Sequence, residues 1–378
     1  MRHSEKELFI GLMSGTSIDA DDAVLIRLSD SIEVVESHSI AISAPLKKNI
    51  LSLCAIGKNE IERSSQLDRE LGFLFAQCAI ELCAKANIKT EEIEAIGSHG
   101  QTVRHTPEGK YPFTLQISDP NTIAEETGIT TVADFRRRDI AAGGQGAPLV
   151  PAFHEALFKS TESNRVIVNI GGMANITLLP KTEPMPVIGF DTGPGNVLLD
   201  YWIHKKKALT FDDAGQWASS GEIHTLLLEQ LLSEHYLHLS HPKSTGRELF
   251  NADWLNHHLS SFSGISDEGI QSTIAELTAQ SIANGITHCD SELNTGIVDE
   301  VFICGGGAKN KHLQKRIQAL LPGKVVTTTE KLELDPDLVE ATAFAWLAYR
   351  TINQLNGNLA SVTGAKGGRV LGGIYLAG

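Results

Sequence analysis

The chain opens with short apolar runs that alternate with polar turns. The runs at residues 7–12, 23–28 and 32–42 have the length of β-strands, and Gly, Ser and Asp separate them, which predicts a meander of adjacent strands. Residues 61–86 carry apolar side chains at the spacing of one helix face and predict an amphipathic helix. Another short strand is expected at residues 93–96.

A similar order returns in the second half. Strands are expected at residues 165–170, 174–179, 187–190, 301–304 and 325–328, and helices around residues 274–286, from about residue 310, and at 340–352. Two meanders, each followed by alternating helices and strands, predict an α/β fold of two similar halves. The cleft between two such lobes is the expected place for a ligand.

Length and charge narrow the possible functions. A chain of 378 residues is expected to form two or three domains. The formal net charge is −14 and no block of Lys and Arg occurs, so a nucleic-acid partner is not expected, because phosphate neutralisation needs clustered cations. Any bound phosphate must be held by backbone N–H groups, a metal ion or a few placed cations.

The cysteines and the N-terminus favour a cytoplasmic protein. The five cysteines are scattered and form no CxxC motif, which predicts reduced thiols in a reducing compartment. The polar N-terminus has no signal-peptide pattern, and no apolar run is long enough to span a bilayer, so no membrane partner is expected.

Three glycine-containing turns are candidates for phosphate binding. Residues 13–22 join two expected strands, and residues 169–175 form a second such turn at the equivalent place in the other half. Residues 305–310 follow a strand and open a helix, whose N-terminus favours negative charge. Each turn alone is also compatible with a plain polar turn, but two opposed hairpins are what a cleft needs to clamp a polyphosphate.

Two other nucleotide-binding patterns are absent from the sequence. The P-loop pattern GxxxxGK[ST] does not occur, because each Gly-Lys pair is followed by Asn, Tyr or Val. The pattern GxGxxG is also missing from the first expected strand–helix turn.

Taken together, the motifs resemble those of the anhydro-N-acetylmuramic acid kinase family. They are GLMSGTSID at 11–19, GSHGQT at 97–102, LQI at 115–117, DFR at 134–136, GGQGAPLVP at 143–151, NIGGMAN at 169–175, FDTGPGN at 190–196, KSTGRE at 243–248, GGGAKN at 305–310, EA at 340–341 and VTGA at 362–365. The match runs through essentially the whole chain in order, which makes it more specific than any single motif.

This resemblance implies a two-lobed actin/hexokinase-like (ribonuclease H-like) α/β fold with an active-site cleft between the lobes. We expect an N-terminal lobe at residues 1–135, with residues 355–378 as a candidate addition to it, and a C-terminal lobe at residues 136–354. The resemblance also implies ATP and Mg²⁺, a homodimer, and a reaction in cell-wall recycling. In that reaction water opens the 1,6-anhydro bridge of anhydro-N-acetylmuramic acid and O6 is phosphorylated, giving N-acetylmuramic acid 6-phosphate.

The resemblance also assigns nucleotide contacts. It places the ATP phosphates on Gly15, Thr16, Ser17, Ile18, Asp19, Ala20, Asp21 and Asp22, with Asp19 as a candidate contact for Mg²⁺. Further nucleotide contacts are expected from Gly171, Gly172, Asn175, Gly305, Gly306, Gly307 and Asn310.

The chain departs from the family at two adjacent positions. The family usually has Gly where this chain has Ala20, and an apolar residue where it has Asp21. A positive φ at Ala20 would carry strain, and Asp21 would place an extra carboxylate near the phosphates.

Two acids are candidates for catalysis. Asp191 ends an apolar strand before a Gly-Pro-Gly turn, which suits either a general base on a rigid element or a cap for the helix that begins near Asn196. The resemblance favours the base, which would activate water toward the anomeric carbon. Glu340 begins a helix, where an acid is favourable with the helix dipole, and the resemblance implies that it orients the water or Asp191.

Four residues are expected at the sugar: His99, Gln101, Arg136 and Asn196. For His99 and Gln101, a ligand contact and a structural hydrogen bond remain open alternatives. Arg136 lies in a run with Arg137 and Arg138, which is typical of a solvated face, but the lactyl carboxylate of the implied substrate needs a cation and Arg binds carboxylates through two hydrogen bonds. Residues 243–247 are a candidate mobile loop near the sugar.

His235, His238 and His241 are spaced as in some metal sites. Pro242 follows at once and no carboxylate or Cys nearby in the sequence completes a ligand set, so we expect a surface helix end instead.

Two other functions fit the same fold. One is an ordinary sugar kinase in which Asp191 deprotonates a substrate alcohol, and the other is a non-catalytic ATP-dependent clamp.

Overall fold

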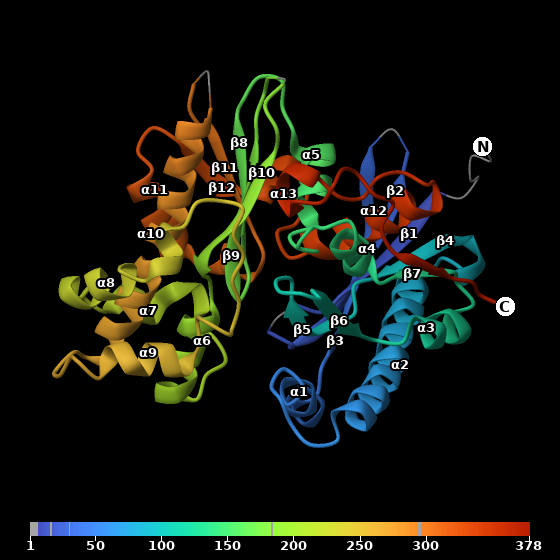
Figure 1. Cartoon of the computed structure of the whole chain (residues 1–378), viewed down its shortest axis with the longest axis horizontal. Helices are drawn as coiled ribbons and strands as arrows, with labels where there is room; N and C mark the ends of the chain where they lie inside the picture. Colours follow the sequence, from blue (N-terminus) through green and yellow to red (C-terminus); the bar gives the residue numbers. More distant parts are fainter. Residues whose placement is uncertain (1–6, 16, 30, 183, 294–295) are drawn as a thin grey trace. The chain divides into compact units, whose positions relative to one another are not determined.

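The computed structural model describes residues 7–15, 17–29, 31–182, 184–293 and 296–378. The chain divides into two compact units (Figure 1). Unit 1 comprises Met1–Phe153 and Leu338–Gly378, and unit 2 comprises His154–Asp337. Residues 136–153 and 338–354, which we expected in the second lobe, therefore belong to unit 1.

Unit 1 is built on a six-stranded sheet in the order β13-β7-β4-β1-β2-β3. Its strands are β1 (Leu8–Met13), β2 (Ala20–Leu28), β3 (Ile32–Ala41), β4 (Ile93–Ser98), β7 (Thr131–Ala133) and β13 (Gly373–Tyr375). A separate hairpin joins β5 (Gln101–Thr106) to β6 (Phe113–Ile117). Strand β1 pairs antiparallel with β2 and parallel with β4, so the expected meander forms one edge of the sheet.

Helix α2 supplies much of the core of unit 1. It spans Glu60–Ala86, close to the residues 61–86 predicted from the helical spacing. Leu71, Phe75 and Leu82 on its apolar face are buried with Ile10 and Leu25 of the sheet. The other helices of unit 1 are α1 (Ala44–Leu51), η1 (Thr90–Glu92), α3 (Pro120–Thr127), α4 (Phe135–Ala141), α12 (Val339–Ile352) and α13 (Ala360–Thr363), while α5 (Val150–Phe158) runs from unit 1 into unit 2.

Helix α12 packs directly on β1 and β4 of unit 1, although it lies far from them in the sequence. The reason is visible at two glycines. A Cβ on Gly11 would collide with the carbonyl oxygen of Ala341, and a Cβ on Gly97 with that of Phe344. These glycines let the helix backbone touch the sheet, which explains why α12 belongs to unit 1 rather than to the second lobe.

Unit 2 contains a five-stranded sheet in the order β10-β9-β8-β11-β12. Its strands are β8 (Arg165–Ile170), β9 (Met173–Leu179), β10 (Ile188–Pro194), β11 (Glu300–Cys304) and β12 (Val325–Thr328). Its helices are α6 (Val197–Lys207), η2 (Asp213–Gly215), α7 (Gln216–Ser220), α8 (Thr225–Leu232), η3 (His235–His238), α9 (Ala252–Leu259), α10 (Asp267–Glu292), η4 (Gly306–Lys309), α11 (Lys311–Leu320) and η5 (Thr329–Leu332). Helix α10 is buried along most of its length, because it packs both on the sheet and on α6, α7, α8 and α11.

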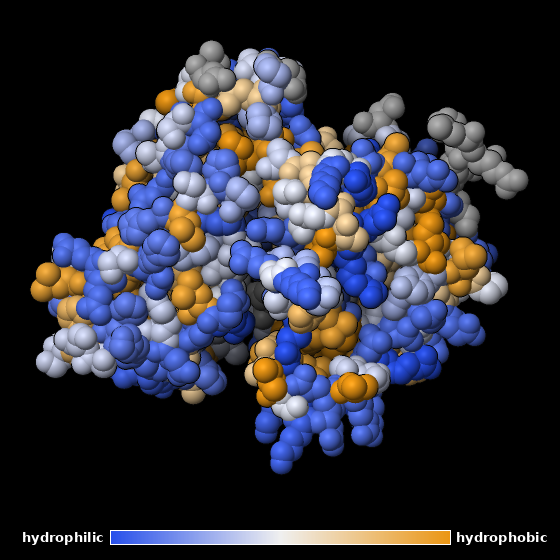
Figure 2. All heavy atoms as spheres, in the orientation of Figure 1, coloured by the Kyte–Doolittle hydropathy of each residue, from blue (hydrophilic) through white to orange (hydrophobic). Residues whose placement is uncertain are grey.

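The two sheets share one topology. In each, the first strand pairs antiparallel with the second and parallel with the fourth, and the third strand lies outside the second. This duplicated order confirms the predicted α/β fold class of the actin/hexokinase-like type, and the interlobe cleft stays a prediction. Hydrophilic residues cover most of the face shown in Figure 2, with hydrophobic ones scattered between them. Of the helices in the described part of the chain, none is long and apolar enough to cross a bilayer.

Candidate active site

The turn after β1 holds the first group of predicted nucleotide contacts. Within it, the N–H of Ile18 donates to the carbonyl oxygen of Gly15 at 3.1 Å. Ile18 has a φ of 55°, whereas Ala20 is the first residue of β2 and has no positive φ. Ala20 therefore carries none of the strain that a positive φ would have caused there, and Ile18 is the left-handed residue. Thr16 lies outside the described residues.

The carboxylates of this turn have different surroundings. Asp19 is exposed and forms an ion pair with Lys47 of α1. Asp21 is fully buried, and its burial, with a contribution from the charge of Asp22, holds the pKa of its carboxyl well above the ordinary value. The neighbouring Cys78 thiol is a weak donor, and both carboxylate oxygens lack a hydrogen bond of ordinary geometry to the described residues. A carboxyl so buried does not offer a charge to phosphates, contrary to our expectation for Asp21.

Gln101 has a structural partner beside the same turn. The hydroxyl of Ser14, which directly follows β1, donates to Oε1 of Gln101 at 2.8 Å, and both side chains are buried. Of the two alternatives left open by the sequence, this contact supports the structural hydrogen bond for Gln101.

His99 and Arg136 are held together in unit 1. Nε and Nη2 of Arg136 donate to Nε2 of His99 at 3.1 and 2.8 Å, and Nη1 donates to the carbonyl oxygen of Gly146 at 2.8 Å. Burial, and secondly the charge of Arg136, hold the pKa of His99 well below its ordinary value, so the ring is neutral with Nε2 as the acceptor. Arg137 and Arg138 are exposed, whereas Arg136 is half-buried and oriented. The run of three arginines is thus not one solvated face.

Helix α12 packs against His99 of this pair. The ring of Phe344 lies 4.6 Å from that of His99, measured between centroids. Glu340 is four residues before Phe344 and so shares its side of the helix. His99, Arg136 and Phe344 are therefore in contact within unit 1, and a place of Glu340 beside them stays a prediction.

In unit 2, Asp191 belongs to a row of polar side chains that crosses three strands. Asp191 of β10 pairs with Asn175 of β9, and Asn175 pairs with Asn169 of β8. Directly paired residues lie on the same face of a sheet, so the three side chains are neighbours. We did not predict Asn169 from the sequence, although it opens the NIGGMAN motif. It is buried, and its Oδ1 has no hydrogen-bond partner in the part of the chain that the structure describes.

The segment between η3 and α9 holds Asp191. The N–H of Thr245 donates to Oδ2 of Asp191 at 2.9 Å, and the N–H of Asp191 donates to the carbonyl oxygen of Lys243 at 3.2 Å. The hydroxyl of Tyr236 donates to the carbonyl oxygen of Asp191 at 2.9 Å. Lys243 and Thr245 thus hold Asp191 in place, and the position of residues 243–247 near the sugar stays a prediction.

Asp191 does not cap α6. The N–H groups of Asn196 and Val197 at the start of α6 donate to the carbonyl oxygens of Gly171 and Gly172. The capping alternative for Asp191 is therefore wrong, because the start of α6 has no side-chain cap. The same bonds show that Gly171 and Gly172 use their carbonyl groups to anchor α6.

The two glycine segments of unit 2 lie side by side at the carboxyl ends of the parallel strands β8 and β11. A Cβ on Gly305 would collide with Oδ1 of Asn169, and one on Gly307 with the side chain of Ile170. Nδ2 of Asn196 donates to the carbonyl oxygen of Ile170 at 3.2 Å. Close backbone approach at such strand ends is typical of ligand sites in α/β sheets.

The side chain of Asn310 caps helix α11. Its Oδ1 accepts the N–H of Leu313 at 2.9 Å, so it is the N-cap of α11. A side-chain contact from Asn310 to nucleotide, as expected from the sequence, would compete with this cap.

The comparison with known proteins decides the family. The family described as anhydro-N-acetylmuramic acid kinase matches residues 7–377. The chain belongs to the anhydro-N-acetylmuramic acid kinase family. A relative of that name from Shewanella putrefaciens is 52% identical over 370 residues, and one from Coxiella burnetii is 50% identical over 370 residues, each alignment covering 98% of both chains. Among solved structures, component A of (R)-2-hydroxyglutaryl-CoA dehydratase from Acidaminococcus fermentans aligns with a TM-score of 0.49 at 13% identity, covering 92% of this chain and 99% of that one.

Family membership confirms the resemblance predicted from the motifs. It makes the chain an ATP-dependent kinase, a phosphotransferase, and so favours an enzyme over a non-catalytic clamp.

Proposed function

We propose that the chain opens 1,6-anhydro-N-acetylmuramic acid with water and phosphorylates O6 from ATP, giving N-acetylmuramic acid 6-phosphate, with Asp191 as the general base. The full-length match to relatives that bear this kinase name supports the reaction. The observation that supports the role of Asp191 is its carboxylate, held by the Thr245 N–H at the end of a buried strand. A base fixed in this way is oriented before the substrate arrives.

The proposed chemistry balances without a protein nucleophile. Asp191 accepts a proton from water as the water oxygen bonds to the anomeric carbon. The bond from that carbon to O6 breaks, and O6 takes the γ-phosphoryl group as ADP leaves. Oriented donors that face the developing charge on the phosphoryl oxygens lower the barrier to such a transfer.

The residues of both units suit Mg-ATP. The exposed carboxylate of Asp19 can meet a hydrated cation, although it must exchange its ion pair with Lys47. In unit 2, Gly305 and Gly307 pack directly on β8, whereas a Cβ on Gly306 would meet only Nδ2 of Asn196 at 3.9 Å. The backbone of Gly306 is therefore the one with room beside it for a phosphate. Bound Mg²⁺ would neutralise charge on the phosphate oxygens.

For the sugar, we assign the lactyl carboxylate to Arg136. Its guanidinium is fixed by His99 and by the Gly146 carbonyl, so little conformational entropy is lost when it binds an anion. Glu340, on the same side of α12 as Phe344, is a candidate to orient the attacking water.

The base is tested by Asp191→Asn. We expect kcat to fall by at least ~10²-fold, the usual scale for a general base, while nucleotide affinity is retained. Asp253→Asn is the matched control, because Asp253 is an exposed acid of unit 2 on α9. Turnover close to normal in Asp191→Asn would show that another group is the base.

The reaction itself is tested with ¹⁸O-labelled water. We expect the label at the anomeric position of the product when the anhydro sugar and ATP are supplied, read before exchange with bulk water. The open sugar, supplied in parallel, distinguishes the ordinary sugar kinase, because that enzyme would phosphorylate it without incorporating label.

Two further properties remain proposals, namely a homodimer, implied by the resemblance, and a cytoplasmic location, inferred from the scattered cysteines without a CxxC motif. Light scattering on the purified protein tests the first, and fractionation of cells tests the second.

A further inference from the structure

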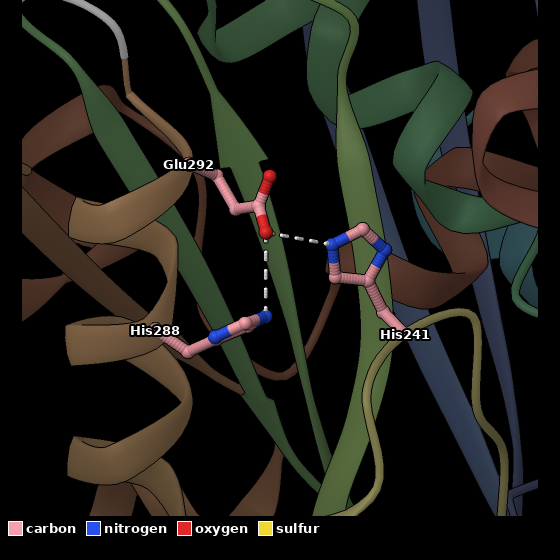
Figure 3. Close-up of side chains that lie close together, drawn as sticks. All are labelled: His241, His288 and Glu292. Atoms are coloured by element: carbon pink, nitrogen blue, oxygen red, sulfur yellow. Dashed lines mark ion pairs between the residues drawn. The ribbon is translucent and has the colours of Figure 1, made fainter.

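Unit 2 contains a cluster of possible metal ligands that the proposed reaction does not use. His241 lies in the segment between η3 and α9, whereas His288 and Glu292 lie one turn apart on α10. Oε1 of Glu292 is 3.6 Å from Nε2 of His241 and 3.6 Å from Nε2 of His288 (Figure 3). One ligand atom from each residue lies within 4.8 Å of the other two.

One polar atom of this cluster, Nε2 of His288, lacks a hydrogen bond within the described part of the chain. A separation of 3.6 Å is too long for a hydrogen bond. The same nitrogen atom is buried. In a tetrahedral zinc site with bonds of about 2.0–2.2 Å, the ligand atoms lie about 3.3–3.6 Å apart. The two separations from Oε1 of Glu292, 3.6 Å each, match this spacing. A cation at the centre would complete all three groups at once.

Aromatic packing holds the two imidazoles in place. The ring of His241 stacks on Phe190, with centroids 5.6 Å apart and planes inclined by 14°. The ring of His288 meets the same Phe190 edge to face at 6.3 Å. Ligands whose orientation is fixed before binding form a precise metal site. The packing of both rings on Phe190 therefore favours a metal site over an ordinary surface ion pair.

We propose that His241, His288 and Glu292 bind one divalent transition-metal ion of the zinc type, with water at the fourth position. Two imidazoles and one carboxylate form a common three-ligand set for such ions. The ion would fasten the segment that carries Lys243 and Thr245 to α10, and this segment holds Asp191. The proposal rests on the geometry of unit 2 and is independent of the proposed reaction.

The test uses the tag-free full chain, stripped of metal with a chelator and titrated with Zn²⁺ against a chromogenic competitor. We expect one equivalent to bind, and His288→Ala and Glu292→Gln each to weaken binding by at least ~10-fold. His235→Ala is the control, because His235 is an exposed histidine of the nearby η3, and it should leave the affinity unchanged. The proposal would be overturned if Zn²⁺ did not bind stoichiometrically. It would also be overturned if the His288→Ala and Glu292→Gln variants bound Zn²⁺ as tightly as the wild type.

A second measurement separates this site from metal bound elsewhere. Zn²⁺ should slow amide hydrogen exchange in residues 239–245 of the wild type and not of His241→Ala, because only an intact site ties this segment to α10. Equal slowing in both proteins would place the metal at another site and contradict the assignment.

Discussion

At the scale of single residues, Asp21 is the most unusual position in the chain. It occupies β2 with no exposed surface, next to Cys78 of α2. Burying a carboxyl without good hydrogen bonds costs free energy, and the group reduces this cost by holding its proton. Asp21 should therefore make the stability of unit 1 depend on pH.

We predict that Asp21→Val stabilises the protein, and that the gain increases with pH. The pKa of the folded carboxyl is raised above the ordinary 3.8, so below that pH both the folded and the unfolded chain carry the proton and no penalty arises. As the pH rises further, the unfolded chain loses the proton first, and the wild type loses up to about 1.4 kcal/mol of stability per pH unit until the folded carboxyl also ionises.

Urea unfolding of both proteins at several pH values from 5 to 8 measures this difference. Val is close to Asp in volume, so the comparison changes mainly polarity. Parallel stability curves for wild type and variant would show that Asp21 keeps an ordinary pKa.

At the scale of elements, α12 is the clearest case of packing that decides the architecture. Its backbone rests on β1 and β4 at Gly11 and Gly97, and it supplies Phe344 to His99. The position of this helix thus depends on the absence of two side chains in the sheet below.

We predict that Gly97→Ala destabilises unit 1 by at least ~2 kcal/mol, because the new methyl group meets the rigid carbonyl group of Phe344 rather than a movable side chain. Catalysis should fall as well, since α12 carries Glu340. Thermal unfolding and turnover measure the two effects. Gly57→Ala is the control: a Cβ there would meet only the flexible end of Arg63. A shift in Tm as small as that of the control would contradict the close packing.

The elements themselves were largely predictable, because local spacing determines them. The helical spacing gave α2 within one residue of its bounds, and α12 and β12 were located equally well. The unit to which α12 belongs was not predictable, since it depends on contacts between residues more than 240 positions apart, such as Gly97 and Phe344.

In the candidate site too, features set by local sequence were predictable and features set by tertiary packing were not. Asp191 and Arg136 stand in recognisable motifs, whereas the burial of Asp21 and the unpaired Oδ1 of Asn169 within the described structure follow from tertiary packing alone. The expectation of no metal site at His235, His238 and His241 stays a prediction, and His241 is one of the three residues of the proposed cluster. The sequence did not reveal that His288 and Glu292 lie near His241, because they stand about fifty residues further along the chain.

At the scale of the whole molecule, one sheet topology occurs twice, yet the two copies carry different chemistry. Unit 1 holds the cation Arg136 with neutral His99 and Glu340, and unit 2 holds Asp191 with the glycine segments at the ends of β8 and β11. With these roles, the sugar and the nucleotide should slow amide hydrogen exchange in different segments of the chain.

We predict that each ligand protects its own set of backbone amides from hydrogen exchange. A non-hydrolysable ATP analogue with Mg²⁺ should slow exchange in residues 13–22, 169–175 and 305–310, whereas the anhydro sugar should slow it around His99 and in residues 134–138. Ligand at 100 times its Kd stabilises the bound state by about 2.7 kcal/mol, so amides that exchange through local opening of the site should slow by up to about 100-fold. Helix α9 carries no proposed contact and serves as the internal control. Protection by the nucleotide that spares both glycine segments of unit 2 would remove them from the ATP site, because backbone amides that hold a phosphate cannot exchange while it is bound.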